Sequence, residues 1–411
     1  MNCDVIVIGA GASGLAAAIE AGRRGLKVTV LEHLDKPLKK ILATGNGKCN
    51  FTNKIIDGES FRGNRASFAY EALKQFGPES VKAAFEDFGV LTLERDGYMY
   101  PANEQARTVR NALLSMAERA GVRIVPGSKV LSAKCAKENV GNDGLKFTVK
   151  CEDHEYRSKS LVLATGGCAG ENLGSDGSGY ELAKGFGHTV ITPRPALCPL
   201  ILGKDKKTAD KLAGVRAKAR ARLLFMEEVK ADFRGEIIFN KLGISGIPVM
   251  QLSRYYDGRA GFSLSLDFLP DMSEDEVFSF LKKTRDKRKE SSCFDGFDGL
   301  VNNKLASEIM LRAGIKGDTP IESVTDSALE AFAKILKDLR MEVTGTGSHS
   351  SAQVTAGGVS TEETDEKTME SKLVKGLYIV GELLDIDGNC GGYNLQWAFT
   401  SGVIAGRSCG A

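Results

Sequence analysis

A glycine-rich run near the start of the chain has the residue types and spacing that hold a diphosphate. The apolar stretch Cys3-Asp4-Val5-Ile6-Val7-Ile8 stops at Gly9-Ala10-Gly11-Ala12-Ser13-Gly14, which reads G-x-G-x-x-G. The first glycine of this pattern permits a tight turn, the second lets the backbone approach a pyrophosphate, and the third lets a helix pack close to the strand. A helix beginning here also offers free N–H groups and a partial positive charge. The run therefore predicts a dinucleotide site.

The elements around this run have the order that such a site requires. Residues 15–24 are alanine-rich and helical in pattern, Gly25 stands where a helix C-cap is expected, and residues 27–31 form a second apolar strand. That strand ends at Glu32, near the usual position of the acid that accepts bonds from a ribose hydroxyl. A carboxylate there favours a free 2′-hydroxyl over a 2′-phosphate.

Three further segments favour FAD over NAD as the dinucleotide. Residues 161–167 form an apolar strand that ends in Ala164-Thr165-Gly166-Gly167, small residues beside which a dinucleotide can pass. Residues 39–53 place glycine, amide, hydroxyl and cationic groups in what we interpret as one loop. The strand at 376–381 ends in Gly-Glu, and its carboxylate, Glu382, can meet ribityl hydroxyls.

The C-terminal helix predicted from about Asn394 to Gly406 follows a Gly-Gly pair. Its N–H groups and positive dipole end would face the flavin N1–C2=O edge, where they stabilise negative charge on the reduced ring.

These residues resemble a known family. The segment from Lys40 to Asn53 and the tail G-E-x-x-D-x-D-G-x-C-G-G-Y-N-L-Q-W-A are similar to the BaiN-like, or aminoacetone-oxidase-like, NAD(P)/FAD-dependent oxidoreductases, and the resemblance runs essentially end to end. It implies an α/β fold in which a Rossmann-type FAD-binding domain of the glutathione-reductase kind carries an inserted β-barrel-like domain and a small helical domain. Lys48 departs from the arginine usual in the family, so a point charge replaces a planar fork.

The resemblance also implies a set of cofactor contacts in this chain. By motif they fall on Gly9, Gly11, Ala12, Ser13, Gly14, Glu32, Lys40, Asn46, Gly47, Lys48, Cys49, Asn50, Ala164, Thr165, Gly166, Gly381, Glu382, Gly392, Tyr393, Asn394 and Leu395, with Val130 meeting the adenine through its backbone. No histidine lies in the 39–53 segment, and Cys49 lacks a nearby partner cysteine, so we expect a packing role for this thiol and noncovalent FAD.

The composition narrows the class of protein. With 411 residues, 42% hydrophobic and 26% charged, the chain is globular and long enough for two or three domains. A net charge of +2 gives no electrostatic case for binding nucleic acid or an acidic membrane.

The nine cysteines include no C-x-x-C pair, so they signal no metal site, and they fit a reducing compartment. We expect a cytoplasmic protein without membrane insertion or signal peptide.

The pattern of elements predicts three domains. The FAD-binding domain takes residues 1–190 and 352–411, a β-rich domain takes 191–271 and 341–351, and a helical domain takes 272–340. Within the first, residues 123–125 and 129–131 read as a strand pair. In the inserted part, basic residues alternate with alanines over 216–222 as in a strand, and Ser273 with Glu276 forms a capping box.

These features favour an FAD-dependent oxidoreductase that moves a hydride between a small organic substrate and the flavin. The sequence contains one dinucleotide motif, so a transient NAD(P)H donor would dock at the flavin face. An amine or aminoketone oxidase that uses O₂ stays open, as does a non-catalytic flavin-binding regulatory protein; a plain NAD dehydrogenase fits least. His349 is a candidate acid, and no catalytic base is assigned.

Overall fold

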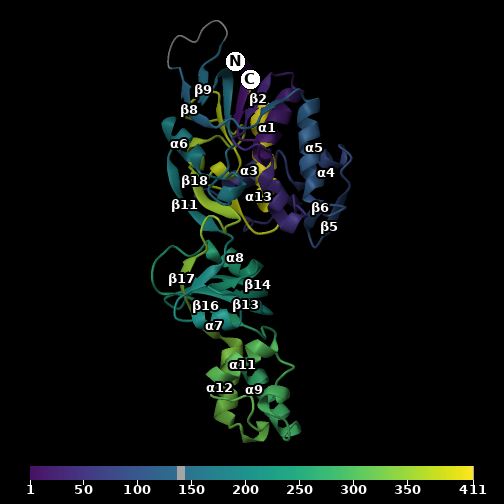
Figure 1. Ribbon diagram of the computed structural model, residues 1–411, viewed down its shortest axis with the longest axis vertical. Coiled ribbons are helices and arrows are strands. Elements are labelled where there is room, and N and C mark those ends of the chain that lie inside the picture. Colours follow the sequence, from purple (N-terminus) through teal and green to yellow (C-terminus); the bar gives the residue numbers. More distant parts are fainter. Residues whose placement is uncertain (137–143, 411) are drawn as a thin grey trace. The chain divides into compact units, whose positions relative to one another are not determined.

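The computed structural model describes residues 1–136 and 144–410, and these fall into two compact units (Figure 1). Unit 1 consists of Met1–Arg194 and Gln353–Ala411, and unit 2 of Pro195–Ala352. The return to unit 1 occurs at Gln353. Division of unit 2 into a β-rich and a helical domain at the boundaries given above stays a prediction.

Unit 1 is built on a seven-stranded sheet with the order β7-β2-β1-β10-β9-β8, to which β19 adds by pairing with β10. The strands β1 (Asn2–Ile8), β2 (Val28–Leu31), β7 (Arg123–Val125), β10 (Glu155–Leu163) and β19 (Leu377–Ile379) pair in parallel, while β8 (Val130–Cys135) and β9 (Phe147–Cys151) are antiparallel. Buried β-branched and leucine side chains fill the parallel strands, as expected for a sheet covered on both faces. This is the predicted Rossmann-type architecture.

Helices and small sheets surround this central sheet. The helices are α1 (Ala12–Arg23), α2 (Lys39–Ala43), α3 (Ser67–Leu73), α4 (Pro78–Glu86), α5 (Ala106–Arg119), α6 (Ser178–Gly185) and α13 (Tyr393–Ser408). The small sheets are β3 (Thr52–Asn53) with β6 (Tyr98–Pro101) and β5 (Thr92–Arg95), β4 (Phe61–Arg62) with β20 (Asp387–Gly388), and β11 (Val190–Ala196) with β18 (Val354–Val359).

Helix α13 packs along α1, and two glycines make this approach possible. A Cβ atom at Gly402 would overlap the carbonyl oxygen of Ser13, and one at Gly406 would overlap that of Ala17. The C-terminal helix therefore closes the core beside the first helix, although nearly 400 residues separate them in the sequence.

Two details of the predicted elements are wrong. Strands β7 and β8 exist, but they do not pair with each other: β7 lies beside β2, and β8 beside β9. The link between them instead runs over the end of β2, because Gly127 N–H donates to Leu34 O and Ser128 N–H to Glu32 O. The 39–53 segment is not one loop either, since it begins with α2 and a 3₁₀ turn, Thr44–Gly47.

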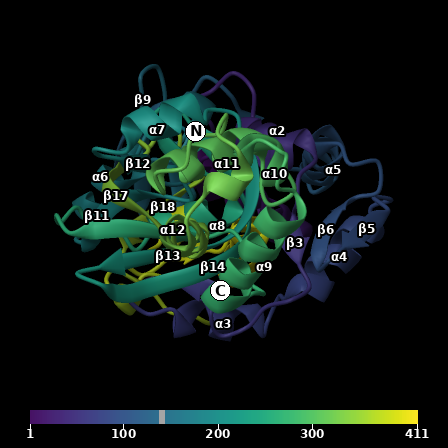
Figure 2. The ribbon, with the colours of Figure 1, turned by 90° about the horizontal axis from the view of Figure 1, so that it is seen from below.

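Unit 2 contains a closed barrel with the strand order β12-β15-β14-β13-β16-β17. Figure 2 labels four of these strands, β12, β13, β14 and β17. Its strands are β12 (Leu200–Leu202), β13 (Arg216–Phe225), β14 (Glu228–Asn240), β15 (Gly243–Ser245), β16 (Phe262–Asp267) and β17 (Leu339–Thr346), with helices α7 (Lys206–Lys211) and α8 (Ile247–Ser253). The helices α9 (Glu274–Lys287), α10 (Cys293–Gly296), α11 (Asn303–Arg312) and α12 (Asp326–Lys337) follow β16 in the chain. The predicted capping box of Ser273 and Glu276 is confirmed at the start of α9.

Two of the four basic side chains on β13 are paired with acids on β14. Arg216 bonds Glu236 at 2.7 Å, and Arg220 makes a two-point contact with Asp232. Cross-strand acids thus offset part of the charge that the sequence places on β13.

Candidate functional site

The glycine turn connects β1 to α1 in the manner predicted. A Cβ atom at Gly14 would overlap the carbonyl oxygen of Gly9, so only glycine lets the helix start this close to the strand. A Cβ at Gly11 would meet nothing within 4 Å, and Gly11 is the N-cap of α1 without a side-chain cap. The first N–H groups of α1, from Ala12 and Ser13, have no intrahelical partner. A diphosphate needs such free N–H donors and the open space in front of them that Gly11 provides.

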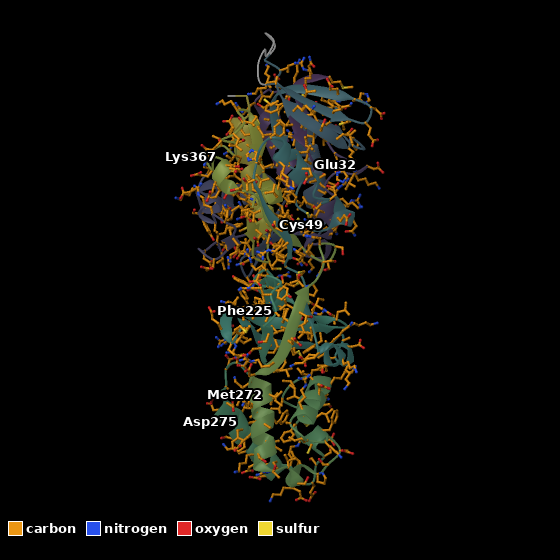
Figure 3. The ribbon with its side chains drawn as sticks, turned by 90° about the vertical axis from the view of Figure 1, so that its left-hand side faces the viewer. Glu32, Cys49, Phe225, Met272, Asp275 and Lys367 are labelled. Carbon is orange, nitrogen blue, oxygen red and sulfur yellow. The ribbon has the colours of Figure 1, made fainter. Side chains whose placement is uncertain are left out.

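Glu32 is a buried carboxylate at the end of β2 (Figure 3). Its Oε2 accepts the Ala10 N–H at 2.8 Å, and its Oε1 accepts the Leu34 N–H at 2.9 Å and lies 3.1 Å from His33 Nδ1. Burial alone would raise the pKa of Glu32, but these hydrogen bonds outweigh it and lower the pKa. The bond to Glu32 raises the pKa of His33. The carboxylate thus fixes the glycine turn and retains acceptor capacity for a hydroxyl.

Replacing Glu32 with Gln gives a pH-dependent loss of stability. The amide has one acceptor oxygen in place of two, so one buried backbone N–H loses its partner, which costs about 1–3 kcal/mol near pH 7. Because the folded pKa of Glu32 is lowered, its contribution is complete above the unfolded pKa, about 4.3, and disappears as the pH falls through the folded pKa. Denaturant unfolding at a series of pH values should show the difference from wild type shrinking over that window, whereas the exposed Glu152→Gln should track wild type. A pH-independent difference would refute this role.

The strand end at Ala164 lies against the glycine turn. A Cβ at Gly9 would lie 2.5 Å from the Ala164 carbonyl oxygen, so the two strand ends touch. Thr165 contacts the start of α6, where a Cβ at Gly179 would overlap its hydroxyl, and Gly166 has a left-handed φ of 76°. Val130 begins β8, two residues after the Ser128 N–H that bonds Glu32 O. The structure therefore gathers these predicted residues at one edge of the sheet.

A second cluster centres on Glu382. Its Oε2 lies 2.8 Å from Lys40 Nζ, and its Oε1 accepts the Thr355 N–H at 2.9 Å. Lys40 Nζ also lies 3.5 Å from Ser175 Oγ. Next to it, a Cβ at Gly381 would lie 2.5 Å from Ser13 Oγ, so this cluster adjoins the N-terminus of α1. Segments that are distant in the sequence thus converge beside the N-terminus of α1.

The 44–50 segment forms a strained turn. Gly45, Asn46, Gly47 and Cys49 have φ values between 54° and 85°, a left-handed region that is uncommon for Asn and Cys. Two N–H groups are engaged within the turn itself, because the Lys48 N–H donates to Gly45 O at 3.2 Å and the Cys49 N–H to Thr44 O at 3.1 Å. Gly47 and Asn46 are exposed, as is Lys48, whose Nζ lies 3.3 Å from Glu104 Oε1.

Cys49 has no accessible surface (Figure 3), and burial raises the pKa of its thiol to about 12. A thiol that stays protonated is a poor nucleophile, which agrees with the predicted packing role.

The N-terminus of α13 meets the same turn. A Cβ at Gly392 would lie 2.5 Å from the Thr52 carbonyl oxygen and 2.7 Å from Asn50 Oδ1, so the helix start sits directly on β3. Asn394 has a structural task, because its side chain accepts the Gly388 N–H at 2.7 Å and donates to the Gly388 carbonyl at 3.0 Å. Tyr393 and Leu395 are half-buried beside it.

Three further residues belong to this site and were not among those predicted. Tyr180 is 4% exposed, and its hydroxyl has no hydrogen-bond partner among the described residues. Burial raises its pKa, and Glu382 adds to the shift, so the two side chains are close. Thr355 accepts the Cys168 and Ala169 N–H groups at 2.8 and 3.0 Å. Gln396, fully buried, holds α13 to Thr52 and to the Phe76 carbonyl. Of these three residues, only Gln396 lies in a motif described above, the C-terminal tail that resembles the family.

His349 lies apart from these residues in the chain, in the bend after β17 in unit 2, and is half-buried. Its role as an acid stays a prediction.

The residues fit FAD. Three features suit a phosphate- and hydroxyl-bearing ligand: free N–H groups and open space at Gly11, an acceptor at Glu32, and the Tyr180 hydroxyl, which is buried without a partner among the described residues. Within residues 1–136 and 144–410 there is no cluster of His, Cys, Asp and Glu that could hold a metal. None of the helices described is long and apolar enough to cross a membrane.

A Rossmann-type unit with this cradle defines a flavin-binding oxidoreductase. The chain matches the model of the HI0933-like protein Rossmann domain family over residues 3–408, and it belongs to that family. The predicted resemblance is thereby confirmed.

Curated relatives cover the whole chain. It is 37% identical to a 3-dehydro-bile acid delta(4,6)-reductase of Clostridium scindens, with 98% of each chain covered. It is 31% identical to a ribosomal RNA dihydrouridine synthase of Escherichia coli, covering 97% of this chain and 96% of the relative. A flavocytochrome c3 fumarate reductase structure aligns with a TM-score of 0.48 at 16% identity, covering 99% of this chain and 78% of the other. The protein is an FAD-dependent oxidoreductase.

Proposed function

We propose that this protein reduces a carbon–carbon double bond conjugated with a carbonyl in a small organic molecule, using noncovalent FAD and NAD(P)H as a transient donor. The observation that carries the proposal is the chemistry shared by the two relatives' names. A 3-oxo group conjugated with 4,6 double bonds, and the uracil ring bond that becomes saturated in dihydrouridine, are both double bonds activated by a carbonyl.

The cradle assigns a task to each group of residues. FAD, when bound, supplies hydride chemistry, and the protein supplies binding, orientation and electrostatics. The N-terminus of α1 would hold the diphosphate through the N–H groups of Ala12 and Ser13, and Glu32 would hold the adenosine ribose. Glu382, fixed by Lys40 and the Thr355 N–H, would bind hydroxyls of the ribityl chain. The positive dipole end of α13 would stabilise negative charge on the reduced flavin.

A small-molecule substrate is part of the proposal. The prediction that no nucleic acid is bound rests on the net charge of +2, and it stays a prediction, because two relatives carry the name of an enzyme that acts on ribosomal RNA.

An anaerobic visible spectrum tests the proposed function. We expect oxidised-flavin bands that bleach when NADH or NADPH is added and return when a 4-en-3-oxo steroid follows. A uridine-rich RNA oligonucleotide serves as the competing acceptor, and recovery with RNA alone would contradict the small-molecule class. Bleaching by an amine together with recovery in air would point to the oxidase alternative, and bands unchanged by every donor to a non-catalytic flavoprotein.

A further inference from the structure

Two tyrosines on one face of β6 have hydroxyl groups that bond to no residue that the structure describes. Tyr98 and Tyr100 are half-buried and alternate with the buried Met99 and Pro101, so both rings project from the same side of the strand. Among the described residues neither hydroxyl makes a hydrogen bond. Neither hydroxyl is among the buried polar atoms that lack a partner, so both are accessible to solvent and free to donate to a bound ligand.

The two rings lie against the loops of the FAD cradle. A Cβ at Gly391, just before α13, would overlap Cε1 of Tyr98, so glycine is needed there for the ring to fit. A Cβ at Gly45, in the strained turn, would lie 3.9 Å from Cε1 of Tyr100. The tyrosines therefore line the region where the 44–50 turn meets the start of α13, at the flavin end of the site rather than the adenosine end.

The strand that carries the rings is held firmly. Asn50 Oδ1 accepts the Met99 N–H at 3.2 Å, Thr52 pairs with Met99 in the β3–β6 ladder, and Asn53 Nδ2 donates to the Gly391 carbonyl at 2.9 Å. These bonds fix β6 relative to both loops of the cradle. Donors fixed in advance stabilise developing charge without the cost of reorganisation.

The groups around the tyrosines keep their protons. Burial raises the pKa of Tyr98, and the neighbouring Cys390 and Asp96 add to the shift. Burial also raises the pKa of Tyr100, and that of the Cys390 thiol, whose Sγ lies 3.8 Å from Gln353 Oε1. At neutral pH the two phenols are therefore hydrogen-bond donors.

We propose that the hydroxyl groups of Tyr98 and Tyr100 bind the carbonyl oxygen of the substrate and stabilise the enolate that forms during reduction. The proposal rests on the proposed function above. A hydride, supplied ultimately by NAD(P)H, adds to the β-carbon; the double bond's electron pair moves toward the carbonyl and leaves its negative charge on the oxygen. A proton from water then adds to the α-carbon, which completes the saturated ketone and the oxidised nicotinamide.

The test separates donor function from folding and from cofactor reduction. Tyr98→Phe and Tyr100→Phe keep the rings and their packing, and Tyr70→Phe, which removes the hydroxyl that accepts the Phe61 N–H at 3.1 Å, is the structural control. In the holoenzyme we expect the rate of bleaching by NAD(P)H to be unchanged in all three. The rate of reoxidation by a 4-en-3-oxo steroid should fall about 100-fold in Tyr98→Phe, and further in the double variant.

Binding of an enolate analogue gives a second measurement, which does not depend on catalysis. 4-Nitrophenolate resembles an enolate, so the holoenzyme should bind it in isothermal titration at a pH where the free phenol is ionised, and Tyr98→Phe should bind it at least about tenfold more weakly. Failure of the wild type to bind the phenolate, or equal binding and reoxidation by Tyr98→Phe, would overturn the inference. A wild type that no enone reoxidises, but whose phenolate binding depends on Tyr98, would overturn the proposed function and leave the donor pair standing.

Discussion

Gly11→Asp is expected to abolish FAD binding while leaving the apoprotein as stable as wild type. The backbone of Gly11 has φ −81° and ψ −171°, which any residue adopts, and an added Cβ meets no protein atom within 4 Å. Asp and Gly differ by only a few tenths of a kcal/mol at a helix N-cap. The carboxylate would, however, occupy the diphosphate position and repel its charge. We expect the dissociation constant for FAD to rise at least about 100-fold, equivalent to ~2.7 kcal/mol.

Flavin fluorescence titration of the apoprotein measures this loss, and thermal unfolding of the apoprotein measures its stability. Gly58→Asp is the matched control, since Gly58 is exposed, its Cβ position is likewise open, and the variant carries the same added charge. Gly11→Ala should fall between wild type and Gly11→Asp. If Gly11→Asp bound FAD as tightly as wild type, the diphosphate would have to lie elsewhere.

Gly402→Val should produce a large loss of stability in unit 1. The new side chain would overlap the Ser13 carbonyl oxygen, and its Cβ would lie 2.8 Å from that of Ala16. Because both atoms belong to the buried face of α1, the two helices must separate, at about 3 kcal/mol or more. For a unit of this size, the melting temperature should fall on the order of 10 °C.

Differential scanning calorimetry of the apoprotein checks this prediction. Gly299→Val in unit 2 is the control, because its Cβ position is open and its φ lies outside the left-handed region. Separation of α13 from α1 also displaces Ser13, so Gly402→Val should weaken FAD binding, unlike the control. A melting temperature within 2 °C of wild type, on the order of 0.5 kcal/mol, would show that the helices tolerate the added volume.

Local patterns in the sequence predicted the parts of the site that short segments build. The turn at Gly9–Gly14, the carboxylate at Glu32 and the Gly-Gly start of α13 are each set by glycine, charge and strand pattern within a few residues. The periodicity of alanines and arginines likewise predicted β13, and Ser273 with Glu276 the start of α9. The chemistry of such segments is readable because their hydrogen bonds are local.

The prediction of a strand pair was wrong because the hydrogen-bonding partners of these strands are distant in the chain. The residues at 123–125 and 129–131 have strand patterns, but a pattern does not say which strand accepts the hydrogen bonds. The path from β7 to β8 is decided by bonds to the end of β2, and no signal in the segment itself reveals them.

By itself, the sequence determined the family, the Rossmann-type FAD domain, the order of the phosphate-binding elements and the packing role of Cys49. The tertiary structure alone brought Lys40, Ser175, Thr355 and Glu382 to one point. It also buried the Tyr180 hydroxyl without a hydrogen-bond partner in the part of the chain that the structure describes. The physical reason is that a helix N-terminus or a tight turn is fixed by nearby backbone geometry, whereas an ion pair or an unsatisfied hydroxyl depends on which distant segments pack against it.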